Sequence, residues 1–200
     1  MPRSWALVLL SGCVPHLYSS ESGDSEPTAW TLPKNTWKQC GTPSSSFYDE
    51  PTGYDVGELF PDARVEDQNG DTVSMWQFTD CVTVVDLSTS WCGPCQELAT
   101  GVDEMYAKYE SYGFAYVTLL SQDQFNNDTD HQDLVDWSKN YGVTTTPILA
   151  DHVYTWEILG GNVAFPRVLL LDRDMTVLNE NVGQKDNQIE AAVRDALGLD

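Results

Sequence analysis

The stretch Trp91-Cys92-Gly93-Pro94-Cys95 decides the fold of this chain. It follows the β-branched run Val82-Thr83-Val84-Val85-Asp86-Leu87, which is typical of a buried strand, and it opens a segment with helical spacing of apolar residues. We therefore expect Cys92 at a helix N-terminus, where unpaired backbone N–H groups and the helix dipole favour a thiolate. Pro94 is compatible with this position because the first helical turn has no N–H partner to lose.

The two-residue spacing of Cys92 and Cys95 allows the two sulfurs to close a small disulfide ring. In such a pair the outer Cys92 attacks a substrate disulfide, and Cys95, one turn further in, resolves the mixed disulfide. The alternative for this spacing is half of a zinc site, which needs two more Cys or His ligands at compact spacing. Cys40 and Cys81 are isolated and no His pair accompanies them, so the pattern favours redox chemistry with no metal and no cofactor.

The segments on either side of this motif alternate between strand and helix patterns. Apolar runs at 114–120 and 168–171 predict two more buried strands, and Asn69-Gly70 between the short segments 63–65 and 72–75 predicts a hairpin. Strands that alternate with helices predict a layered α/β fold with parallel pairing. Three helical faces are expected, formed by Leu98, Val102, Met105 and Tyr109, by Leu134, Trp137 and Tyr141, and by Ile189, Val193, Ala196 and Leu197.

The chain has 200 residues, 41% of them apolar, which suits one domain with an appendage. Residues 14–55 are rich in proline, serine and glycine without a sustained period, so they are expected to form a tether, and residues 56–200 the domain. Aromatic residues within 14–55 indicate that part of this segment lies on the domain surface. They are Trp30, Trp37, Phe47, Tyr48 and Tyr54.

The charge of the chain excludes two classes of partner. Ten Lys and Arg against 31 Asp and Glu give a net charge of −21. Nucleic acid binding depends on basic groups that displace counterions, and docking to anionic lipids depends on a polybasic patch, so we expect neither.

The N-terminus resembles an export signal. Arg3 precedes the apolar run Trp5-Ala6-Leu7-Val8-Leu9-Leu10, and Leu10-Ser11-Gly12-Cys13 is similar to a bacterial lipobox. In that interpretation residues 1–13 are the signal, and acylated Cys13 anchors the protein to a membrane. An ordinary secretory signal and a misplaced start codon are the alternatives.

A family resemblance rests on these motifs. WCGPC at 91–95 is the active-site sequence of thioredoxins, and residues 56–199 resemble the TlpA/ResA-type periplasmic branch of that fold, in which helices flank a central mixed sheet with an N-terminal hairpin extension. Besides the motif, the similar segments are 56–62, 141–151 and 165–172. The resemblance implies a thiol–disulfide oxidoreductase of the bacterial envelope that acts on protein substrates and is served by an upstream thiol electron donor. Gly93-Pro94 favours a reductant.

The resemblance also assigns roles to particular residues. Pro166 matches the family's cis-proline, so it and Phe165 are expected to form the substrate-binding edge, together with Gly93 and Pro94. An ordinary trans proline is the alternative. Asp86 matches the buried carboxylate that exchanges a proton with the inner cysteine, unless it is purely structural. Trp91 matches a tryptophan that supports partner docking, with core packing as the alternative.

Some residues depart from the family pattern or suggest other functions. Gln96-Glu97 stands where thioredoxins often have a lysine, and Arg167 where cytochrome-maturation members have a glutamate. Thr89 with Arg167 is similar to the peroxide-binding residues of peroxiredoxins, although Val85 replaces their proline, so a thiol peroxidase is one alternative function. A binding module whose Cys92–Cys95 disulfide stays closed is another.

Two further groups have open interpretations. Cys40 and Cys81 either form a structural disulfide, as exported proteins favour, or Cys81 is buried and inert while Cys40 is free or pairs with another molecule. The oxygen-rich segment 126–131 with Asp133 is either a calcium loop or, more simply, an acidic helix N-terminus. His16, His131 and His152 receive no role.

Overall fold

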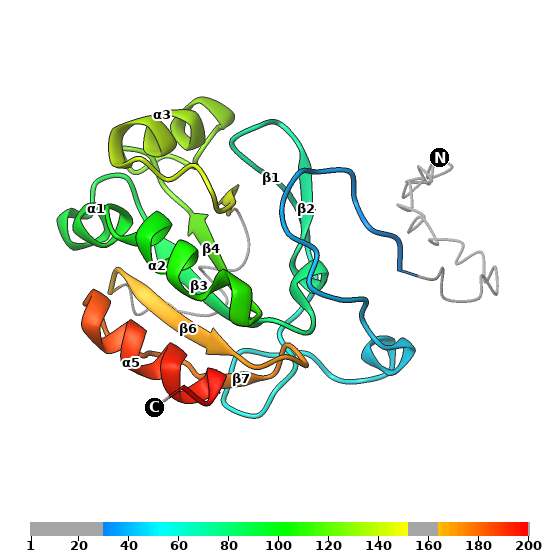
Figure 1. The fold of residues 1–200 in the computed structure, drawn as a ribbon. Coiled ribbons are helices and arrows are strands. Elements are labelled where there is room, and N and C mark those ends of the chain that lie inside the picture. The colour runs from blue at the N-terminus through cyan, green and yellow to red at the C-terminus, as the bar shows by residue number, and fades with distance from the viewer. Residues whose placement is uncertain (1–29, 152–163, 200) are drawn as a thin grey trace, which may run out of the picture.

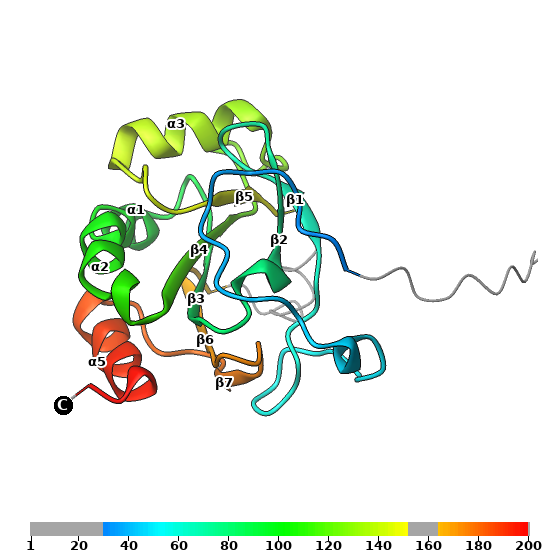
Figure 2. The ribbon, with the colours of Figure 1, turned by 45° about the vertical axis from the view of Figure 1, so that its right-hand side comes forward.

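The computed structural model describes residues 30–151 and 164–199. Its main sheet has five strands in the order β5-β4-β3-β6-β7 (Figures 1 and 2). β3 pairs in parallel with β4, and β4 with β5, whereas the pairs β3–β6 and β6–β7 are antiparallel. The prediction of a thioredoxin-like mixed sheet is therefore confirmed. The strand bounds are Val82–Ser88 for β3, Phe114–Leu120 for β4, Ile148–Ala150 for β5, Arg167–Leu171 for β6 and Val177–Asn179 for β7.

Within the described residues, α-helices α1, α2, α3 and α5 cover one face of the sheet, and the N-terminal part covers the other (Figure 2). The single helical face expected from Leu98 to Tyr109 is divided between two helices, because α1 ends at Ala99 and α2 begins at Val102 after Gly101. The helix bounds are Gly93–Ala99 for α1, Val102–Tyr109 for α2, His131–Tyr141 for α3 and Asp186–Leu197 for α5. Short 3₁₀ helices span Ser45–Tyr48, Met75–Phe78 and Glu110–Tyr112.

The alternation of side chains along β3 explains how one strand serves two cores. Val82 and Val84 point to the helical side, where they share a hydrophobic cluster with Cys92 and Cys95. Val85 and Leu87 point to the other side and pack with residues of the N-terminal half. β3 is buried on both faces, so its sequence is mainly apolar and β-branched, with Asp86 as its one ionisable residue.

The predicted hairpin is present as β1 (Arg64–Glu66) and β2 (Thr72–Ser74), paired antiparallel. Its turn is held by the buried Asp67, whose carboxylate accepts the backbone N–H groups of Asn69 at 2.8 Å and Asp71 at 2.9 Å. The indole of Trp37 donates to the other carboxylate oxygen. The hairpin is thus tied to the segment that precedes it in the chain.

Residues 30–55 differ from the expected tether, because they lie against the domain. Phe47 is buried and contacts the ring of Trp76 edge-on at 5.3 Å, and Tyr54 contacts Phe60 in the same way at 5.5 Å. A disulfide joins Cys40 to Cys81 at the start of β3, with the two Cα atoms 5.6 Å apart. By packing, the domain therefore begins well before residue 56.

The signal and lipobox predicted for residues 1–13, including Cys13, lie outside the described residues, as does His152. Across residues 30–151 and 164–199, none of the helices has both the length and the apolar character that crossing a bilayer needs.

Candidate active site

The structure brings Cys92 and Cys95 together as a disulfide with a Cα–Cα distance of 5.2 Å. Cys92 is the N-cap residue of α1 in an extended conformation, and its sulfur accepts the backbone N–H of Cys95 at 3.2 Å. Only 4% of Cys92 is exposed and none of Cys95. Cys92 is therefore the outer sulfur, and it already accepts a hydrogen bond of the kind that stabilises a thiolate at a helix N-terminus.

Backbone and side-chain bonds hold the turn before α1. The Cys92 N–H donates to the Thr89 carbonyl at 3.2 Å. The Ser90 carbonyl accepts the side-chain amides of Gln96, at 2.7 Å, and of Gln124. The turn is fixed from both α1 and the loop after β4, so the two sulfurs are held at one position above the carboxyl end of β3.

An aromatic pair lies beside the disulfide. The Trp91 side chain is 40% exposed, its ring meets Phe165 edge-on at 5.7 Å, and its indole N–H donates to the Gln122 side chain at 3.0 Å. Phe165 is half-buried and packs against the cluster that contains both cysteines. Sequence reasoning missed Gln122, whose only signal is its position just after the end of β4.

The peptide bond between Phe165 and Pro166 is cis, and Pro166 leads directly into β6. β6 pairs with β3 so that Arg167 lies opposite Leu87, which sets Pro166 next to the end of the strand that delivers the motif. The Pro166 carbonyl accepts the Gln184 side-chain amide at 3.2 Å.

Asp86 is fully buried on β3, on the side of the sheet that faces the cysteine cluster. Its carboxylate accepts the hydroxyls of Ser88 at 2.9 Å and Tyr116 at 3.3 Å. Burial raises the pKa of this carboxyl to about 7, because the two hydroxyl bonds only partly offset the loss of solvation. A carboxyl with a pKa near neutrality can both accept and return a proton at physiological pH.

Two features weighed from the sequence have other partners in the structure. The Arg167 guanidinium donates to the Glu180 carbonyl at 2.6 Å and lies 3.7 Å from the carboxylate of the same residue. In the acidic segment, Asp130 caps α3 by accepting the Asp133 N–H at 3.1 Å, and Asp133 accepts the Asp130 N–H at 2.9 Å. These carboxylates act as a capping box at a helix start.

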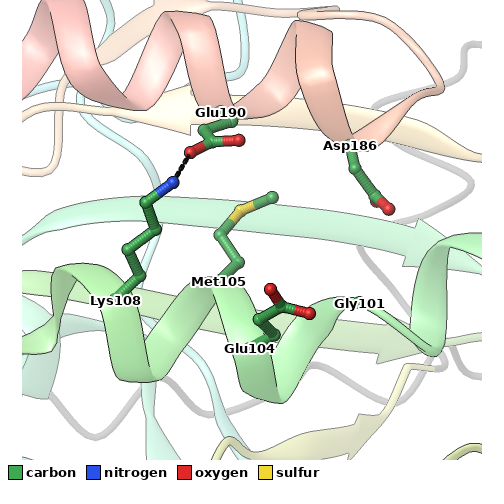
Figure 3. Close-up of a pocket in the computed structure, with 6 residues that line it drawn as sticks. All are labelled: Gly101, Glu104, Met105, Lys108, Asp186 and Glu190. Carbon is green, nitrogen blue, oxygen red and sulfur yellow. Dashed lines mark hydrogen bonds and ion pairs between the residues drawn. The ribbon is translucent and has the colours of Figure 1, made fainter.

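Two depressions lie along α5, one of them beside α1 and the other beside α2. One, of about 580 Å³, is lined by Pro94, Glu97 and Leu98 of α1 and by residues 184–187. The next, of about 140 Å³, lies between α2 and α5, where the Lys108–Glu190 ion pair bridges the helices (Figure 3). The carboxyl groups around this second depression repel one another. Burial raises the pKa of Asp186, and the negative charges of Glu97, Glu104 and Glu190 raise it further. Neither depression contains Cys92 or Cys95.

A mixed sheet whose central strand delivers a Cys-x-x-Cys disulfide to a helix N-terminus, beside a cis X-Pro bond, defines the thioredoxin-like class of proteins. The sequence pattern of the AhpC/TSA family matches residues 56–179. The chain belongs to this family and is a thioredoxin-like thiol–disulfide oxidoreductase of the ResA type.

Individual relatives agree with this assignment. The thiol–disulfide oxidoreductase ResA of Bacillus thuringiensis is 23% identical over 136 residues, 67% of this chain and 73% of that protein. Thioredoxin 2 of Chlorobaculum tepidum is 31% identical over 107 residues, 52% of this chain and 83% of that protein. A solved structure of a thiol:disulfide interchange protein DsbE from Chlorobium tepidum, 26% identical, matches with a TM-score of 0.61 over 73% of this chain and 100% of that one.

Proposed function

We propose that this enzyme reduces disulfides in protein substrates with Cys92 as nucleophile, Cys95 as resolving thiol and Asp86 as the group that moves the proton. The single observation that carries the proposal is the stack of these groups on one side of the sheet: an outer sulfur at a helix N-terminus, an inner sulfur, and a buried carboxyl on the strand leading to them.

The reaction begins with the protein in its dithiol form. The Cys92 thiolate attacks one sulfur of the substrate disulfide, forms a mixed disulfide and releases the other substrate sulfur, which takes up a proton. Asp86 then takes the proton of the Cys95 thiol, and the resulting thiolate attacks the Cys92 sulfur. The second substrate sulfur leaves with the proton that Asp86 held, so two electrons pass to the substrate and the Cys92–Cys95 disulfide remains.

The exposed side chains around the disulfide supply the docking edge. Trp91, Gly93 and Pro94 are exposed beside the nearly buried Cys92, so a substrate sulfur must approach over them. Phe165 and Pro166 lie beside Trp91, and we propose that they bind an extended segment of the substrate. Such a shallow edge suits a protein chain rather than a small molecule enclosed in a cavity.

The reductant direction is supported by the Gly93-Pro94 dipeptide, which this chain shares with thioredoxins. We place the protein in the bacterial envelope, held by a lipid on Cys13 and supplied with electrons by an upstream thiol donor. The envelope location is supported by the likeness to ResA and DsbE, and the anchor by the sequence Leu10-Ser11-Gly12-Cys13.

The test is reduction of insulin disulfides by the protein with dithiothreitol as electron source. We expect Cys92→Ser to abolish the activity and Cys95→Ser to accumulate a mixed disulfide with substrate. The control Ser45→Ala, at an exposed position, should leave the rate of insulin reduction unchanged. Equilibration with glutathione should give a reduction potential of about −270 mV, as for thioredoxin, and not the value of about −120 mV that is typical of the oxidant DsbA.

Two results would contradict this function. Dithiol-dependent consumption of hydrogen peroxide that outpaces insulin reduction would identify a peroxidase. A Cys92–Cys95 bond that strong thiol reductants leave closed in the folded protein would identify a redox-inert binding module.

A further inference from the structure

Tyr116, which has no role in the exchange steps above, reaches the buried carboxyl of Asp86 from the neighbouring strand β4. Tyr116 lies on β4, which pairs in parallel with β3 so that Tyr116 is opposite Val84 and Thr118 is opposite Asp86. Its side chain rises on the helical side of the sheet, is only 1% exposed, and ends with the hydroxyl 3.3 Å from the carboxylate of Asp86. A phenylalanine ring would pack in the same place, so packing alone does not explain the Tyr116 hydroxyl.

The Tyr116 hydroxyl stays protonated under working conditions. Burial raises the pKa of Tyr116 well above 10, and the negative charges of Asp86 and, on α5, of Asp186 act in the same direction. The phenol is therefore a permanent donor, and it stabilises the Asp86 carboxylate more than the carboxylic acid. Ser88 provides the second hydroxyl to the same carboxyl, from β3 itself. On the same side of the sheet, the hydrophobic cluster contains Cys92 at the N-cap of α1 and Cys95 within α1, and both thiols titrate once they are reduced.

The distances show which effect dominates at Asp86. A hydroxyl-to-carboxylate bond in proteins is usually about 2.5–2.7 Å long, so the 3.3 Å bond from Tyr116 is a long one. Burial consequently outweighs both donors, and the pKa of Asp86 is about 7 rather than 3.8. Without the phenol it would be higher still, and fewer molecules would hold the carboxylate that takes the Cys95 proton.

We propose that Tyr116, through the hydroxyl bond to Asp86, is a positioning residue for proton transfer at Cys95. The proposal rests on the function assigned above to Asp86. It extends that function by naming the group that keeps the carboxyl oriented and partly ionised in an apolar interior. Tyr116 does not contact the substrate or the reacting sulfurs, and it acts only through Asp86.

The test compares Tyr116→Phe with Tyr109→Phe. Tyr109 is a matched control because it is also buried on the helical side and donates to a carboxylate, that of Glu190 at 2.6 Å, away from Asp86. In the disulfide form, the Asp86 carboxyl carbon is titrated by ¹³C NMR. In the dithiol form, insulin reduction is followed from pH 5.5 to 9.5.

We expect Tyr116→Phe to raise the Asp86 midpoint by about one pH unit, since a hydrogen bond to a charged group contributes on the order of one to two pKa units and this one is long. A one-unit rise from pH 7 leaves about one carboxyl in ten ionised at pH 7 instead of one in two, so the rate should fall about fivefold there and recover by about pH 9. Tyr109→Phe should shift neither the midpoint nor the rate profile.

The outcomes separate the two proposals. An Asp86 midpoint that is the same in Tyr116→Phe and the unsubstituted protein overturns the role of Tyr116 and leaves Asp86 as the proton carrier. A midpoint that rises while the pH–rate profile stays in place overturns the role of Asp86, and the role of Tyr116 with it. If Tyr116→Phe does not fold, the ring carbon that bears the Tyr116 hydroxyl is titrated in the unsubstituted protein. A chemical shift that follows the Asp86 midpoint supports the contact, and one that does not overturns it.

Discussion

Replacing Cys40 and Cys81 by alanine in one variant removes the disulfide that ties the N-terminal segment to the start of β3. The bond joins positions 41 residues apart. Treated as loss of chain entropy in the unfolded state, closing a loop of that length stabilises the folded protein by about 4 kcal/mol at 25 °C. Because Cys81 is buried, the loss of its sulfur contacts adds to this effect.

The Cys92–Cys95 disulfide provides an internal control. It spans only three residues, so the same relation gives about 1.6 kcal/mol for a variant with alanine at both positions. The two variants should therefore differ in stability by about 2 kcal/mol, although each loses one disulfide.

The measurement is urea unfolding of the oxidised proteins without reductant, followed by tryptophan fluorescence and circular dichroism. Trp37 and Trp76 report on the N-terminal side of the sheet and should become exposed first in the variant that lacks Cys40 and Cys81. Equal loss of stability in the two variants would contradict this estimate, because the N-terminal segment would then be held by packing rather than by closure of the long loop.

Two further predictions concern carboxyl groups. Asp86→Asn should stabilise the protein at pH 8 by about 4 kcal/mol, because a carboxyl whose pKa rises from 3.8 to about 7 on folding opposes folding above pH 4. Urea unfolding of the unsubstituted protein should show that the free energy of unfolding falls as pH rises from 4 to 7 and is level above it. Equal stability of the two proteins at pH 8 would contradict the raised pKa of Asp86. Asp130→Ala should lower the free energy of unfolding by about 1 kcal/mol through loss of the α3 cap. Thermal unfolding measures this change, with Gln132→Ala, a substitution in α3 outside the capping box, as control. An unchanged midpoint in Asp130→Ala would show that the cap is dispensable.

The elements nearest the active site follow closely from local sequence. The strand patterns at 82–87 and 114–120 match β3 and β4 almost to the residue, because a strand buried on both faces is built mainly of apolar and β-branched residues. The break between α1 and α2 does not show in the spacing of Leu98, Val102 and Met105, since those residues keep one face across the break.

The N-terminal segment shows where composition misleads. Prolines and serines in 14–55 indicate a tether, yet Phe47, Tyr54 and the Cys40–Cys81 bond hold its second half on the sheet. A few aromatic anchors and one long-range disulfide offset the ordering entropy of a polar segment, and the partners of those anchors are distant in sequence.

The cysteine pair at the start of α1 could be predicted from local sequence, because Cys92, Pro94 and Cys95 interact within one helical turn. The surroundings of this pair depend on how distant segments pack. The bond from Tyr116 to Asp86 depends on the register of two strands that are joined by two helices, and the contact between Trp91 and Phe165 depends on how β6 enters the sheet. Such contacts between distant segments arise from packing of the whole sheet, and no local pattern encodes them.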